Sequence, residues 1–231
     1  MEKASILVVE DDTITLEFVR VCLSKEGFDV TCCKTGVDAL SKLKKLRPDL
    51  IVLDIMLPDI NGMDICKTVK SNEATKHIPI VMLTLKGDES DIVNGLEQGA
   101  DDYILKPFSP KIFVARINTV LRRNHSEVAE EATLIKVHDL VIDTERREII
   151  VGDKLVKLTH IESLVLLLLA KKQGKSFSRA EIVEAVWGKS FPVADRSVDV
   201  QVVSLRKKLG PLSYYIETIR SFGYRFTENP N

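Results

Sequence analysis

Short apolar runs, each ended by polar residues, alternate along the first half of the chain with segments of helical periodicity. Four of these runs begin at Ile6, Leu50, Ile80 and Tyr103. A continuous apolar run of this length indicates a strand buried on both faces, as in a parallel sheet covered by helices. The alternation therefore predicts an α/β unit with a parallel sheet between two layers of helices.

The helical segments and one further strand complete this pattern. One further strand, the second in chain order, is expected at 29–33, and the helices are expected at 13–26, 36–46, 62–70, 88–98 and 109–123. Five strands alternating with five helices predict a doubly wound, five-stranded parallel sheet over residues 1–124.

The pattern changes after residue 124. Residues 125–132 are acidic and lack periodicity, which predicts a linker. Residues 134–158 alternate in short pieces, as in antiparallel hairpins. The capping boxes Thr159-His-Ile-Glu162 and Ser178-Arg-Ala-Glu181 then predict the starts of two helices.

A third helix and a hairpin complete the second domain, residues 133–231. The helix is expected to begin near Asp195, and its buried stripe consists of Val198, Val202, Leu205 and Leu209. Residues 216–226 predict a strand, a turn and a strand. Three helices followed by a hairpin are the order of a winged helix-turn-helix, an α+β fold.

Charge and composition narrow the functional classes. The formal net charge of −1 is the sum of −2 for residues 1–124, −3 for the linker and +4 for the second domain, which favours contact of that domain with a polyanion. No run approaches the roughly 20 apolar residues of a membrane span, and no signal peptide is visible, so a cytoplasmic protein without membrane contact is expected. The four cysteines, Cys22, Cys32, Cys33 and Cys66, are expected to be reduced core thiols.

Polar residues follow the strands at the edge where parallel strands end and ligands bind. Glu10 and Asp11 follow the first strand, Asp54 ends the third, and Thr84 and Lys106 follow the next two. Carboxylates this close repel one another unless a cation such as Mg²⁺ joins them. Asp54 is then expected to attack a phosphoryl donor, Lys106 to neutralise the transferred group, and Thr84 to donate to its oxygens.

These residues resemble a known family. Together with Tyr103, Pro107, Met56-Leu57-Pro58 and Asn61-Gly62, they resemble the receiver domain of bacterial response regulators. Residues 196–200, 205–209, 217–220 and 222–226 resemble the winged-helix effector domain of the OmpR/PhoB subfamily. The resemblance covers nearly the whole chain, and its strength lies in the joint spacing across two domains.

The resemblance implies a flavodoxin-like receiver whose Asp54 is phosphorylated by a sensor histidine kinase. It also implies Mg²⁺ held by Glu10 or Asp11, by Asp54 and by the main-chain carbonyl of Met56. A cis peptide bond is implied between Lys106 and Pro107. Phosphorylation is expected to draw Thr84 toward the phosphate and to turn Tyr103 inward, which promotes dimerisation through the fourth helix, fifth strand and fifth helix.

On this dimer face the resemblance implies intersubunit ion pairs of Asp101 with Arg123 and of Asp102 with Arg116. A third pair is replaced here by Ile92 and Ile112. We expect a symmetric homodimer with a more apolar seam. The alternative is simple core packing of one isoleucine.

A second departure from the family follows Thr84. A small residue is usual there, whereas this chain has Leu85. A bulky side chain is expected to hinder water on its way to the acyl phosphate and so to slow autodephosphorylation. The alternative is that Leu85 merely packs.

The resemblance implies contact of the third effector helix with double-stranded DNA. Because one stripe of this helix is buried, Gln201, Val203 and Ser204 are expected to face the bases. Close relatives often carry arginines at the last two of these positions. The residues expected to contact phosphates are Arg196, Arg206, Lys207 and Lys208. Arg220 is expected to enter a minor groove. The loop 188–194 is expected to face RNA polymerase.

The sequence thus predicts a transcription regulator, not an enzyme beyond slow autophosphatase activity, that binds paired direct repeats near promoters. One alternative is a winged-helix regulator that works without phosphorylation. Another is an aspartyl phosphatase of the haloacid-dehalogenase type, which needs a second Asp two residues after the nucleophile. Met56 occupies that position, which counts heavily against the phosphatase.

Overall fold

The computed structural model describes residues 3–85, 99–125, 134–137, 139–143, 148–188 and 195–227, without the side chains of 123–125 and 195. The chain divides into two compact units, Met1–Ser126 and Glu127–Asn231. The helix expected at 88–98 lies outside the described residues. Among the described helices, none has the length and apolar character needed to cross a membrane.

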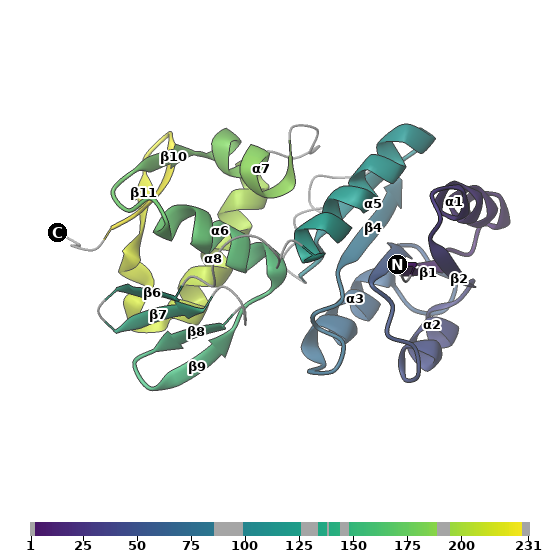
Figure 1. Ribbon diagram of the computed structural model, residues 1–231, viewed down its shortest axis with the longest axis horizontal. Helices are drawn as coiled ribbons and strands as arrows, with labels where there is room; N and C mark the ends of the chain where they lie inside the picture. The colour runs from purple at the N-terminus through teal and green to yellow at the C-terminus, as the bar shows by residue number, and fades with distance from the viewer. Residues whose placement is uncertain are drawn as a thin grey trace. The chain divides into compact units, whose positions relative to one another are not determined.

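The first unit is built on a five-stranded parallel sheet (Figure 1). In spatial order its strands are β2 (Asp29–Cys33), β1 (Ser5–Val9), β3 (Leu50–Asp54), β4 (Ile80–Leu85) and β5 (Asp102–Lys106). The central strand β3 is buried at all five positions, because both faces of the sheet are covered. The predicted parallel sheet is therefore confirmed.

Helices pack on this sheet in pairs. They are α1 (Thr13–Lys25), α2 (Gly36–Leu43), α3 (Gly62–Ser71) and α5 (Pro110–His125). Helices α1 and α5 contact each other, as do α2 and α3. The main core cluster joins alternate strand residues such as Ile6 and Val8 to Leu23 of α1 and Phe113 of α5. The apolar residues that recur periodically in the sequence thus form one face of the core.

Gly62 brings α3 close to the end of β3. A Cβ atom at this position would lie 2.0 Å from the main-chain oxygen of Asp54, a distance that no side chain tolerates. The Gly62 amide donates to the carbonyl of Ile55 at 2.8 Å, and Asn61 caps α3 through the amide of Met63. The Asn61-Gly62 pair therefore positions α3 against the strand that carries Asp54.

The second unit begins with an antiparallel sheet, as predicted. Its strands follow chain order: β6 (Leu134–Val137), β7 (Leu140–Asp143), β8 (Glu148–Val151) and β9 (Lys154–Lys157). Three helices follow: α6 (His160–Ala170), α7 (Arg179–Trp187) and α8 (Asp195–Leu209). Both predicted capping boxes, at the starts of α6 and α7, are present. The predicted stripe of α8, including Val202 and Leu205, is fully buried.

A three-stranded sheet closes the second unit. A 3₁₀ helix (Gly210–Tyr215) leads to β11 (Ile216–Ile219) and β12 (Gly223–Phe226), and β12 also pairs with β10 (Ser176–Ser178). The predicted winged helix-turn-helix order is confirmed. Strand β10 was not predicted, because three residues are too few for strand periodicity to show. All four cysteines are free thiols, as predicted.

Candidate functional site

Three carboxylates meet at the carboxyl edge of the parallel sheet. Glu10 and Asp11 follow β1, and Asp54 ends β3 beside it, so that one carboxylate oxygen of each residue lies within 4.8 Å of the others. Glu10 and Asp54 are buried, whereas Asp11 is exposed. The geometry brings together the acids that the sequence placed at one edge.

Lys106, at the end of β5, reaches into this cluster. Its Nζ lies 2.6 Å from Glu10 Oε2 and 3.0 Å from Asp54 Oδ1. Burial raises the pKa of Glu10 and of Asp54, although the hydrogen bonds from Lys106 oppose this. Burial would by itself lower the pKa of Lys106, but its hydrogen bonds to both acids raise that pKa overall. With the acids ionised, one ammonium faces three carboxylates. The net negative charge of the cluster favours the binding of a further cation.

The donor set fits a small, hard divalent cation, because it consists of oxygen atoms on a partly open edge. Both carboxylate oxygens of Glu10 are engaged, Oε2 by Lys106 and Oε1 by the amide of Asp12 at 3.3 Å, whereas the ion pair of Asp54 with Lys106 uses only Oδ1. Asp11 and Asp54 are therefore the acids best placed to hold such an ion. Met56 follows Asp54 by two residues, and its side chain is exposed.

Thr84 and Tyr103 lie on neighbouring strands behind this edge. Thr84, on β4, donates its hydroxyl hydrogen to the main-chain carbonyl of Leu85 at 3.0 Å. A hydroxyl has one hydrogen to donate, so in this structure it is not given to the Asp54 carboxylate. Tyr103 is fully buried, with its hydroxyl 3.9 Å from the sulfur of Met63. Its ring thus points inward in this structure, and its expected turn on phosphorylation stays a prediction. The Lys106–Pro107 peptide is cis, as expected.

Leu85 follows Thr84 and is exposed to solvent. Its side chain is 61% exposed. The alternative in which Leu85 merely packs in the core is therefore wrong. The effect of Leu85 on water near Asp54 stays a prediction.

The residues expected on a dimer face pair within the chain instead. Asp102 accepts from Arg116 Nη1 at 2.8 and 3.0 Å. Asp101 is buried and forms an ion pair with Lys70 of α3 at 2.7 Å. In this structure Asp101 is thus paired within its own chain, and its intersubunit pair with Arg123 of a partner stays a prediction.

The apolar part of that face is only partly described. Ile112 on α5 is 54% exposed, so it is not an isoleucine packed in the core. Ile92 and the side chain of Arg123 lie outside the described residues.

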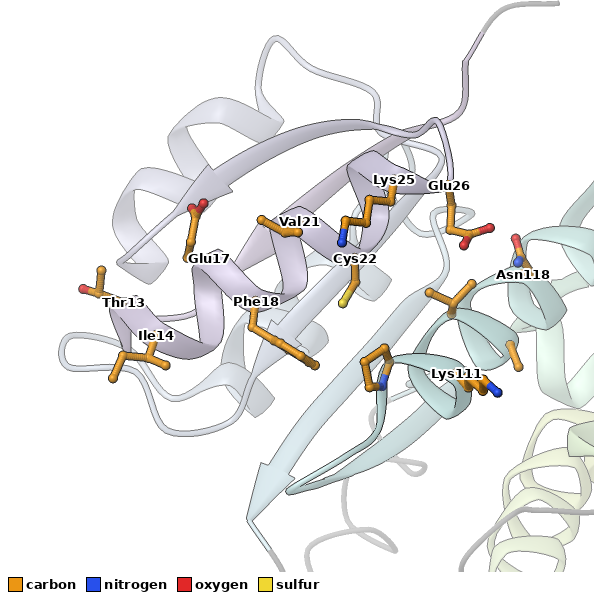
Figure 2. Close-up of a pocket in the computed structure, with 13 residues that line it drawn as sticks. Thr13, Ile14, Glu17, Phe18, Val21, Cys22, Lys25, Glu26, Lys111 and Asn118 are labelled. Carbon is orange, nitrogen blue, oxygen red and sulfur yellow. The ribbon is translucent and has the colours of Figure 1, made fainter.

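An apolar groove of about 990 Å³ lies between α1 and α5. Figure 2 shows Phe18 and Cys22 pointing from α1 toward α5, with Lys111 and Asn118 on the opposite wall. Ile14, one turn before Phe18, is 81% exposed. Because α1 begins directly after the carboxylates, the groove adjoins the edge where Asp54 lies.

The outward face of α8 differs from the one predicted. Gln201 is only 2% exposed, so the prediction that it faces the bases is wrong. Ser204 was also predicted to face the bases, but its hydroxyl donates to the buried carboxylate of Glu162 at 2.5 Å. Val203 and the cations Arg196 and Lys207 are exposed.

Two further cations predicted to bind phosphates hold the domain together. Lys208 forms an ion pair with Glu162 at 2.5 Å and contacts the carbonyl of Lys157. Arg206 donates to the carbonyl of Ile216 at 2.7 Å and to the hydroxyl of Thr218 at 2.7 Å. In this structure both cations stabilise the position of α8, which corrects their expected role.

Glu162 helps to position α8, a role that the sequence did not predict. The sequence indicates it only as the N3 residue of a capping box, where it accepts from the Thr159 amide at 2.7 Å. The sequence carries no signal for its second role, because Ser204 and Lys208 are 42 and 46 residues away. Arg220, by contrast, is exposed at the β11–β12 turn where it was expected.

Comparisons with known proteins agree with this geometry. Residues 6–118 match the model of the response regulator receiver domain, and residues 152–226 match that of the C-terminal domain of transcriptional regulatory proteins. The chain is 41% identical to the DNA-binding response regulator MtrA of Mycobacterium tuberculosis (strain H37Rv), over 95% of each chain. It is 39% identical to the phosphate regulon transcriptional regulatory protein PhoB of Escherichia coli K12, over 96% of this chain and 97% of that one.

A solved structure is also similar to this chain. The response regulator DrrB, a Thermotoga maritima OmpR/PhoB homolog, is 33% identical and has a TM-score of 0.52, with 98% of this chain and 100% of that one covered.

Proposed function

Because the chain belongs to the OmpR/PhoB subfamily of response regulators, we propose that Asp54 is the phosphoacceptor through which a sensor histidine kinase controls its binding to DNA. The observation that carries the proposal is the Asp54 carboxylate, 3.0 Å from Lys106 Nζ at an edge shared with two further acids. A buried acid beside a fixed ammonium suits a nucleophile whose side chain carries more negative charge once a phosphoryl group is attached.

The transfer is a displacement at phosphorus. A carboxylate oxygen of Asp54 attacks the phosphohistidine of the kinase, the P–N bond breaks, and the electron pair of that bond stays with the imidazole. Lys106 neutralises the charge of the group that arrives on Asp54. Mg²⁺, held by Asp11, Asp54 and the main-chain carbonyl of Met56, supplies charge neutralisation at the phosphoryl oxygens when bound.

The kinase docks on the groove between α1 and α5. A phosphohistidine must approach Asp54 across the sheet edge, and α1 begins at this edge. Ile14 and Phe18 offer apolar surface there, while Glu17 and Lys25 provide charge at the rim. Such a groove suits the apolar face of a partner helix.

Phosphorylation shifts the equilibrium between monomer and dimer toward the dimer. The Thr84 hydroxyl, now bonded to Leu85, gains a stronger acceptor when a phosphoryl group is attached to Asp54. Its movement biases the surface formed by the fourth helix, β5 and α5, where Ile112 is exposed beside the Asp102–Arg116 pair. The surface then pairs with its copy in a homodimer.

The dimer places two second units on direct repeats of double-stranded DNA. Helix α8 lies in the major groove, Arg196 and Lys207 contact phosphates, and Arg220 enters the minor groove. The loop proposed to contact RNA polymerase, 188–194, lies outside the described residues after Gly188. Autodephosphorylation is slow, because Leu85 stands beside the path of the attacking water.

The test is the intact mass of three proteins after incubation with acetyl phosphate and Mg²⁺: wild type, Asp54→Asn, and Asp64→Asn as a control on an exposed acid of α3. Wild type and Asp64→Asn should each gain one phosphoryl group and elute earlier in size exclusion. Asp54→Asn should do neither. A phosphoryl group on Asp54→Asn would assign another acceptor, and none on any protein would favour a regulator that works without phosphorylation.

A further inference from the structure

Helix α8 presents an apolar residue at the centre of its outward face. Val203 is 61% exposed, in the middle of a helix whose other valines and leucines are buried. At about 100° of rotation per residue, Arg196 lies about 20° from Val203 around the helix axis and Lys207 about 40°. The two exposed cations thus flank Val203 along the helix.

The polar residues beside Val203 are turned toward the protein. Ser204 and Lys208 lie about 100° and about 140° from Val203 around the axis. Both contact the carboxylate of Glu162, whose side chain is 3% exposed. This buried carboxylate determines the rotation of α8 about its axis, since two side chains one turn apart bind to it.

The remaining polar groups on the outward face are also engaged. Asp199 accepts from Arg179 Nε at 2.7 Å and from the Tyr224 hydroxyl at 2.6 Å. Arg206 donates to Ile216 and Thr218 of the hairpin. Val203 therefore lies near the centre of this face with its side chain exposed, whereas these polar neighbours are bonded to other parts of the domain.

We propose that Val203 determines sequence specificity by contacting the methyl group of a thymine in the major groove. The side chain of Val203 has no hydrogen-bonding atom, so it distinguishes bases only by apolar contact. The C5-methyl of thymine is the apolar group that an unmodified base presents in the major groove. This inference rests on the proposed function, because it requires α8 to lie in that groove.

The test begins with a duplex selected from a random library by the full chain after treatment with acetyl phosphate and Mg²⁺. Each thymidine of that duplex is then replaced singly by deoxyuridine, which removes one methyl group and leaves every hydrogen-bonding atom in place. Binding is measured by fluorescence anisotropy for wild type, Val203→Ala and Leu155→Ala. Both substitutions shorten an exposed apolar side chain of the second unit and keep the charge, but Leu155 lies on β9 and not on α8.

One thymidine should show a roughly fourfold loss of affinity for the wild type, the effect of exposing one methyl-sized apolar group. Leu155→Ala should show the same loss at the same position. Val203→Ala should bind both duplexes equally, because the contact that distinguishes them is gone.

Two results would overturn the inference: a full deoxyuridine effect in Val203→Ala, or a selected duplex with no sensitive thymidine. Failure of the proposed function gives a different result. In that case the selection recovers no sequence-selective duplex at all.

Discussion

The buried ion pair between Lys70 and Asp101 allows a quantitative prediction about the first unit. Lys70 Nζ lies 2.7 Å from Asp101 Oδ2, and their side chains are 6% and 1% exposed. The same carboxylate oxygen accepts from the Ile80 amide at 2.8 Å, while Lys70 also donates to the carbonyl of Ile78 at 2.9 Å. The pair therefore joins the end of α3 to the segments that begin β4 and β5.

Lys70→Met removes the ammonium and keeps an apolar stem of similar length. It leaves the Asp101 carboxylate buried without a countercharge, which costs about 3–5 kcal/mol of unfolding free energy. With a urea dependence of about 2 kcal/mol per molar, the midpoint should fall by about 1.5–2.5 M. Adding Asp101→Asn should recover part of the loss, because a neutral amide needs no countercharge.

Lys76→Met is the matched control. Lys76 pairs with Glu73 at 2.6 Å, but these side chains are 25% and 72% exposed, so its removal should cost only about 0–1 kcal/mol. Urea unfolding is followed by far-ultraviolet circular dichroism. Fluorescence of Trp187, the single tryptophan of the chain, reports the second unit separately. Equal, small shifts in both variants would refute the reasoning.

Three further predictions concern the switch. Ile14→Glu should slow phosphotransfer from the cognate kinase by roughly ten- to a hundredfold, because an apolar contact is lost, yet leave phosphorylation by acetyl phosphate unchanged. The control Val37→Glu, on the exposed face of α2, should change neither reaction. If Ile14→Glu slowed phosphorylation by the kinase and by acetyl phosphate equally, docking in the groove would be contradicted. Ile112→Arg should weaken phosphate-dependent dimerisation by about tenfold, as measured by analytical ultracentrifugation, and an unchanged dimer would remove Ile112 from the seam. Leu85→Ala should shorten the phosphate half-life of Asp54 severalfold in a mass-based decay assay, whereas an unchanged half-life would show that Leu85 does not hinder water.

Much of the fold could be predicted, because its signals are local. The central strand β3 is an apolar run buried at every position, and the expected bounds of the more exposed edge strand β2 match those observed. Helices α6 and α7 begin at capping boxes whose residues are three apart. Strand β10 was missed because its three residues form a strand only by pairing with β12, which is far away in the chain.

The position of the acid cluster could also be predicted, because parallel strands end at one edge and carry their terminal residues there. The sequence could not show that Lys106 bonds to Glu10 as well as to Asp54, since that depends on which side chains share the buried space. Nor could it show that Thr84 donates to Leu85 in this state.

By itself, the sequence determined the order of strands and helices, the family, and the residue types gathered at the sheet edge, because periodicity, caps and strand ends are properties of neighbouring residues. Only the tertiary structure decided which side chains are available to a partner. Gln201 became buried, Ser204 and Lys208 turned to Glu162, and Asp101 paired with Lys70. The physical reason is that a polar group in a folded chain takes the nearest partner that satisfies its charge and hydrogen bonds, and that partner lies far away in the sequence.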